Sequence, residues 1–202
     1  STLYFIIRVI MPSSHDYIKD KRNKNIKIFV NNNFYTRDKA QISVFDSGFL
    51  LGDGVWSGIR YHNNKFLFLK DHLSRLFDDA KKIDLKIHLS KKEITKILTD
   101  TIKVNKMKTD VHLRLVISRG IKSTPYQDPA FTISKPTIVV IPEYKQPQES
   151  VYKKGLILKT VKTIRGPHNV QDPRINSLSK LNCIIACIEA KKQNADEALM
   201  FD

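Results

Sequence analysis

The feature that most constrains this chain is its last stretch, residues 172–202. A polar start, Asp172-Pro-Arg-Ile-Asn-Ser, leads into the apolar run 181–192, which predicts a buried helix. Cys183 and Cys187 lie four residues apart in this run and therefore share one face of the helix. Because free cysteine is commonly buried, we expect both thiols in the core of a domain, without a metal or a disulfide.

Three further motifs lie upstream. The first spans residues 42–60, where Gly52-Asp-Gly-Val-Trp enters a strand, and glycine suits such a turn because it accepts positive φ or a close neighbouring chain. The second, residues 71–83, contains His-Leu-Ser-Arg-Leu with apolar residues at helical spacing. The third is Val116-Ile-Ser-Arg-Gly at the end of an alternating strand. The chain therefore combines strands and helices in an α/β pattern.

These four blocks, in this order, resemble the class IV (fold type IV) aminotransferases, and the resemblance covers about residues 27–202. It implies an α/β (α+β) fold with two domains, pyridoxal 5'-phosphate as cofactor, and transfer of an amino group between an aliphatic, branched-chain amino acid and a 2-oxo acid. It also implies a homodimer. Two alternatives stay open: an aminodeoxychorismate lyase-like enzyme, and a catalytically impaired relative that binds a phosphorylated ligand.

This chain lacks the family's cofactor-bound lysine at the position where the alignment would place it. When the match is anchored on Glu189 and the residues after it, that column falls on Asn176, whose amide cannot form a Schiff base. Lys180 lies four residues later, close to one helical turn, so its long side chain is the candidate catalytic amine. The resemblance also places Asn176 at the cofactor. The alternative for Lys180 is a solvated residue at the start of the helix.

Other site residues follow from the resemblance. Arg75 matches the family's phosphate-binding arginine, with His72 on the same helix face, because a guanidinium can hold two phosphate oxygens. Trp56 matches an aromatic wall of the substrate pocket, although a core tryptophan would also fit this position. Candidate contacts for the substrate carboxylate lie in the loop after residue 118: Arg119, Lys122 and Tyr126.

The expected domain organisation has four parts. Residues 1–25 form an N-terminal arm, 26–142 a small α/β domain, 143–150 a linker that follows Pro142 and contains Pro147, and 151–202 the first part of a larger cofactor-binding domain. The match stops before the residue that would contact the ring nitrogen, so the second domain is expected to be truncated relative to its relatives.

Local patterns predict individual elements. Residues 26–30 and 34–37 flank an asparagine-rich turn, as in a hairpin. Ser90 and Glu93 form a capping box that opens a helix. Alternation over 111–117 predicts a half-buried strand, and the apolar run 137–141 a buried one.

The composition limits the classes of partner that we expect for this chain. The formal net charge is +15, but only residues 19–27 form a dense basic patch, and this patch has no interleaved aromatics. We therefore expect a solvated arm and no nucleic-acid partner. No apolar run is long enough to span a bilayer, and two cysteines without a disulfide pattern favour a reducing, cytoplasmic compartment.

Overall fold

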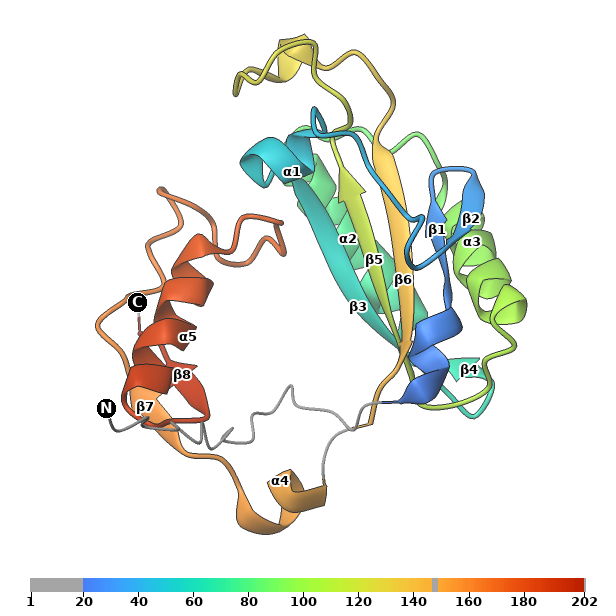
Figure 1. Cartoon of the computed structure of the whole chain (residues 1–202). Helices are drawn as coiled ribbons and strands as arrows, with labels where there is room; N and C mark the ends of the chain where they lie inside the picture. Colours follow the sequence, from blue (N-terminus) through green and yellow to red (C-terminus); the bar gives the residue numbers. More distant parts are fainter. Residues whose placement is uncertain (1–19, 147–148, 202) are drawn as a thin grey trace, which may run out of the picture. The chain divides into compact units, whose positions relative to one another are not determined.

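The computed structural model describes residues 20–146 and 149–201, and these divide into two compact units (Figure 1). The first unit comprises residues 20–146 together with 172–180, and the second comprises 149–171 and 181–201. Most of the arm expected over residues 1–25 and linker residues 147 and 148 lie outside the described residues.

The first unit is built on a six-stranded antiparallel sheet with the order β2-β1-β6-β5-β3-β4. The strands are β1 (Lys27–Val30), β2 (Asn33–Thr36), β3 (Gly54–His62), β4 (Lys65–Phe66), β5 (Val111–Ser118) and β6 (Thr137–Tyr144). Two helices, α2 (Leu69–Lys82) and α3 (Lys91–Val104), pack on the sheet and share one apolar core with it (Figure 1). Residues alternate along β3 and β5, so every second side chain is buried against the helices and the others lie on the opposite face.

Several predicted elements are confirmed. β1 and β2 form the expected hairpin, and Asn31 in its turn has a φ of 55°. The Ser90–Glu93 capping box opens α3 with both reciprocal hydrogen bonds present. The predicted helix over residues 71–83 is α2.

Two predicted boundaries differ from the structure. The linker was expected to begin at residue 143, but β6 continues through Pro142 to Tyr144. Proline is tolerated there because β1 pairs with β6 only at Val139 and Val140, which leaves one side of Pro142 outside that ladder. Residues 21–25, expected in the exposed arm, form the 3-10 helix η1 (Lys21–Asn25), which buries Asn23.

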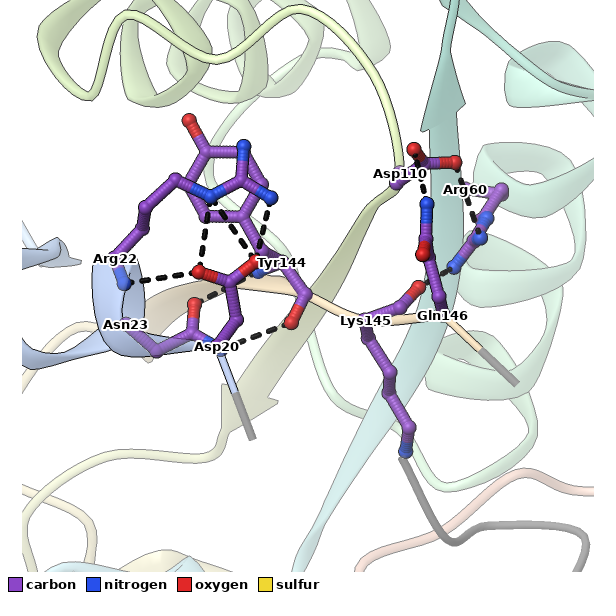
Figure 2. Close-up of polar contacts among 8 residues, drawn as sticks. All are labelled: Asp20, Arg22, Asn23, Arg60, Asp110, Tyr144, Lys145 and Gln146. Atoms are coloured by element: carbon purple, nitrogen blue, oxygen red, sulfur yellow. Dashed lines mark hydrogen bonds and ion pairs between the residues drawn. The ribbon is translucent and has the colours of Figure 1, made fainter. Parts of the chain in front are cut away.

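The end of β6 is held from two sides (Figure 2). On one side, the Asn23 amide donates to the Tyr144 carbonyl at 2.9 Å and accepts from the Tyr144 N–H at 2.8 Å, and the Arg22 guanidinium stacks on the Tyr144 ring. On the other side, Arg60 donates to the Lys145 carbonyl at 2.6 Å. Asp110 accepts from Gln146 Nε2 at 2.6 Å. These contacts fix the chain up to residue 146.

A distant segment completes the free edge of β3. β4 pairs with β3 only at Tyr61 and His62, so the edge near Gly54 needs another partner. Asn176 O accepts from Trp56 N at 3.0 Å, and Leu178 N donates to Gly54 O at 3.0 Å. Residues 172–180 were expected in the second domain, but these backbone hydrogen bonds make them part of the first unit.

The second unit contains the helix α4 (Glu149–Lys154), the parallel pair β7 (Leu158–Thr160) and β8 (Glu197–Leu199), and the helix α5 (Leu181–Lys192). The bounds of α5 match the prediction, but its predicted burial was wrong: only Ala186 and Ala190 are buried, and Cys183 and Cys187 are exposed. The described part of this unit packs against one side of α5 only, around Val161 and Ala195. Within the described residues, no helix is long and apolar enough to cross a membrane.

The fold makes a specific prediction for Gly54. A Cβ at Gly54 would lie 2.5 Å from Ile117 O and 2.8 Å from Ser118 Cα, both backbone atoms that cannot rotate away. We expect Gly54→Ala to lower the free energy of unfolding by about 2 kcal/mol or more, as overpacking does. Urea unfolding would measure the loss.

Gly58→Ala is the matched control on the same strand. Its Cβ would meet two side chains and no backbone: His112 Nε2 at 2.7 Å, which a rotation of the imidazole relieves, and Trp56 Cζ3 at 3.5 Å, an ordinary contact distance. We expect a loss below about 1 kcal/mol, because a flexible neighbour relieves the clash. Equal losses for the two variants would contradict the close approach at Gly54.

Candidate active site

The first group of site residues lies on segment 172–180. The Asn176 side chain donates from Nδ2 to Trp56 O at 2.9 Å and accepts from Lys180 Nζ at 3.3 Å. The backbone N–H of Asn176 donates to Asp79 Oδ2 of α2 at 3.1 Å. Because both its backbone and its amide are held, Asn176 is a fixed acceptor that orients the half-buried Lys180 amine.

The second group lies on the sheet face opposite the helices. Lys180 Nζ is 5.8 Å from the centre of the Trp56 ring, and the Arg114 guanidinium stacks on the same ring at 3.9 Å. Arg114 pairs with Gly58 across the strands, and the missing side chain at Gly58 leaves room beside Trp56. Within the described residues, the buried Trp56 Nε1 has no hydrogen-bond acceptor. The indole therefore has two cations near its ring and retains one unused donor.

The third group lies on α2. His72, Arg75 and Asp79 are spaced three and four residues apart and therefore share one helix face. His72 Nδ1 lies 3.2 Å from the Ser57 hydroxyl of β3, and Asp79 contacts segment 172–180. Arg75 lies between these two attachments, is exposed, and makes no hydrogen bond or ion pair with any described residue. Its guanidinium can therefore bind an anion.

The neighbour of Arg75 is held uncharged. Burial, and then the positive charge of Arg75, lower the pKa of His72 below its ordinary value of 6.5, while Asp71 opposes the shift. A neutral imidazole avoids a partly buried cation next to the charge of Arg75, and Arg75 keeps its positive charge at neutral pH.

The structure does not bring Arg119 together with Trp56 and Lys180. Its Nε and Nη2 donate to the two oxygens of Asp53 at 2.6 and 3.0 Å. Its Nη2 and Nη1 also donate to the carbonyls of Ile83 and Asp84, at 2.7 and 2.9 Å. A guanidinium with its fork filled in this way has little capacity for a substrate carboxylate.

The two other loop candidates also lie apart from this group. The Lys122 side chain is 1% exposed, and its amine donates to the Asp128 carbonyl at 2.8 Å, which places it inside the loop. Tyr126 is exposed and packs edge-on against Phe131 in the same loop.

Sequence reasoning missed Arg114 and Asp79. The alternation along residues 111–117 contained a usable signal, because it places Arg114 on the face opposite the core, where Trp56 also lies. Asp79 had no local signal, since its partner Asn176 is 97 residues away in the sequence.

Comparison with known proteins gives relatives along most of the chain. A Methanocaldococcus jannaschii protein with the provisional name of branched-chain-amino-acid aminotransferase is 37% identical over 177 residues, which are 88% of this chain and 60% of that protein. Branched-chain-amino-acid aminotransferase-like protein 1 of Arabidopsis thaliana is 35% identical and is matched over 89% of this chain and 32% of its own length. The chain therefore spans less than two thirds of these relatives.

Solved structures show the same fold. The branched-chain aminotransferase of Thermoproteus uzoniensis, solved with norvaline, matches 87% of this chain and 59% of its own with a TM-score of 0.74 and 24% identity. The branched-chain amino acid aminotransferase from Escherichia coli matches 89% of this chain and 59% of its own, with a TM-score of 0.73 and 18% identity.

The family assignment rests on a model of a whole family. The model for amino-transferase class IV matches residues 54–202, which include β3, α2, β5 and segment 172–180. This range is well over half of the chain and contains Trp56, Arg75, Arg114, Asn176 and Lys180. The chain belongs to the class IV aminotransferase family.

Proposed function

We propose that the complete protein is a pyridoxal-phosphate-dependent aminotransferase that moves an amino group between an aliphatic amino acid, most suitably a branched-chain one, and a 2-oxo acid. The observation that carries this proposal is the Lys180 amine, 3.3 Å from Asn176 Oδ1 and beside the Trp56 ring. A primary amine is the group that such a reaction requires from the protein. The relatives named as branched-chain-amino-acid aminotransferases support the substrate class.

The donor set fits the cofactor in two respects. Arg75 offers a guanidinium without a protein partner among the described residues, which suits a phosphate. Lys180 offers the amine, because Asn176 stands at the position where the family has its lysine. Bound pyridoxal phosphate would supply an electron-withdrawing ring that stabilises negative charge at the substrate Cα.

The role proposed for Lys180 is to hold and move a proton at Nζ. General base catalysis requires the base within hydrogen-bond reach of the proton that it takes, and an ammonium that returns it later. The hydrogen bond to Asn176 Oδ1 fixes the direction of the side chain, because Asn176 is itself held by Trp56 and Asp79. Asn176 thus orients the amine.

The substrate pocket is proposed on the open face of the sheet. The Trp56 ring supplies an apolar wall for an aliphatic side chain, and the Trp56 indole N–H, buried without an acceptor among the described residues, is a donor for a ligand oxygen. Arg114 is the cation best placed for a carboxylate, since a guanidinium stacked on Trp56 keeps its N–H groups in its own plane, where they can still donate hydrogen bonds. We propose Arg114 for this role, ahead of Arg119, Lys122 and Tyr126.

A second candidate function rests on Asn176 itself. Its amide cannot form a Schiff base with the cofactor, and its hydrogen bonds tie it to Trp56, Asp79 and Lys180. If Lys180 stays with Asn176, the chain is a catalytically impaired relative that binds a phosphorylated ligand through Arg75 without turnover.

We also propose that the complete protein forms a homodimer. Eight large apolar side chains are exposed on two segments of the first unit, which suits a surface that another molecule covers. They are Ile42, Val44, Phe45, Phe49, Leu51, Tyr126, Phe131 and Ile133. The two segments are joined to each other, since Lys122 N donates to Phe45 O at 2.9 Å.

One prediction of the proposed function concerns Arg75. Arg75→Ala should weaken the binding of pyridoxamine 5'-phosphate by about 10- to 100-fold, the effect of losing a hydrogen-bonded charge pair. Quenching of Trp56, the single tryptophan of the chain, would report binding. Lys81→Ala, an exposed cation further along α2, is the control and should bind normally. Unchanged affinity in Arg75→Ala would remove Arg75 from the site.

The second prediction separates the two candidate functions. After incubation with pyridoxal phosphate and reduction with borohydride, the phosphopyridoxyl group should be found on Lys180 by peptide mass spectrometry and be lost in Lys180→Met. Lys92→Met, which removes an exposed cation on α3, should keep the label. Binding through Arg75 with no label on Lys180 would establish the impaired relative.

The third prediction concerns assembly. Sedimentation velocity of the full-length protein should give a dimer, and Phe49→Asp should shift it toward the monomer, because a carboxylate would be buried without a partner. Phe68→Asp is the control, since Phe68 is also exposed but lies at the start of α2. A monomeric full-length protein would contradict the proposal.

A further inference from the structure

The Arg119 side chain connects three parts of the first unit. It is 12% exposed, and its fork binds both carboxylate oxygens of Asp53, at 2.6 and 3.0 Å. The same fork donates to the carbonyls of Ile83 and Asp84, directly after the last turn of α2. Charge-assisted hydrogen bonds of this kind are among the strongest in proteins, and cations at a helix C-terminus are favourable.

Asp53 links Arg119 to the edge of β3. It lies between Gly52 and Gly54, and its backbone is fixed from both sides: Asp53 N donates to Ser47 O, and Asp53 O accepts from Arg119 N, both at 3.3 Å. The adjacent Gly54 O accepts from Leu178 N at 3.0 Å. Leu178 is two residues before Lys180. A displacement of Asp53 would therefore move the backbone that supports the catalytic amine.

The other end of the connection is α2, the helix with Arg75 and Asp79. Its C-terminal carbonyls are bound by Arg119, and Asp79 binds the N–H of Asn176. Segment 172–180 is thus attached to α2 directly through Asp79 and to β3 through Gly54. Arg119 binds both Asp53, next to Gly54 of β3, and the end of α2, and so fixes the distance between these two elements.

We propose that Arg119 is a positioning residue, which sets the place of Lys180 relative to Arg75 through Asp53 and the end of α2, and does not bind the substrate carboxylate. The inference rests on the proposed function, in which Lys180 is the amine and Arg75 the phosphate ligand. Four of the five N–H donors of a guanidinium are needed for the observed contacts, so no fork remains for a carboxylate.

The test uses the 202-residue chain without cofactor. Arg119→Lys keeps the charge and one hydrogen bond but cannot serve Asp53 and two carbonyls together. We expect the rate of acetylation of Lys180, followed by peptide mass spectrometry, to rise several-fold, and quenching of Trp56 by acrylamide to increase. Asp53→Asn, which keeps the shape and removes the charge, should give the same two changes and serves if Arg119→Lys does not fold.

Arg60→Lys is the matched control. Arg60 is also a half-buried arginine that donates to a carbonyl, Lys145 O at 2.6 Å, but it lies at the other end of β3 (Figure 2). It should lose stability without a change at Lys180. A purely structural role for Arg119 would therefore lower stability in both variants and leave Lys180 acetylation unchanged, and this result would overturn the proposal.

The test distinguishes failure of the positioning role from failure of the proposed function. If Lys180 takes no phosphopyridoxyl group while Arg119→Lys still exposes it, the proposed function fails and the positioning role of Arg119 stands. If Lys180 takes the group equally in the wild type and in Arg119→Lys, with equal acetylation, the positioning role fails and the proposed function stands.

Discussion

The pairing of residues 176–178 with the edge of β3 is the interaction on which the site depends. Without it, Gly54 O and Trp56 N would be unpaired polar groups at an open sheet edge, and Asn176 and Lys180 would have no fixed position. Gly54 permits the approach because it has no Cβ where Leu178 and the backbone of β5 come close. The amide of Asn176 then adds side-chain hydrogen bonds to the same edge.

The resulting site combines groups with different tasks on different supports. Trp56 comes from the covered edge of the sheet and Arg114 from the neighbouring strand β5. Arg75 comes from a helix packed on the sheet, and Lys180 from the attached segment. Because the pKa of His72 is lowered, Arg75 carries the positive charge of the His72–Arg75 pair. Sites on strands and helices are held more precisely than sites on free loops, because packing fixes their backbone.

Much of the fold could be predicted from the sequence because its signals are local. Alternation gave β5, the Asn31 turn gave the hairpin, and the Ser90–Glu93 box gave the start of α3. Contacts between distant residues could not be predicted in this way. The partners of Arg119 lie 35 to 66 residues away, and the burial of Lys122 depends on a carbonyl reached only after the loop folds back. The exposure of Cys183 and Cys187 likewise depends on what packs against α5, which an apolar pattern alone does not specify.

The long sequence separation between Trp56 and Asn176 has a consequence for biosynthesis. The last strand of the sheet, β6, ends at Tyr144, 32 residues before Asn176, so during translation the sheet can assemble before the segment that closes its edge has left the ribosome. The nascent chain therefore passes through a stage with a formed sheet and an unprotected β3 edge, in which Trp56 is present but the amine is not.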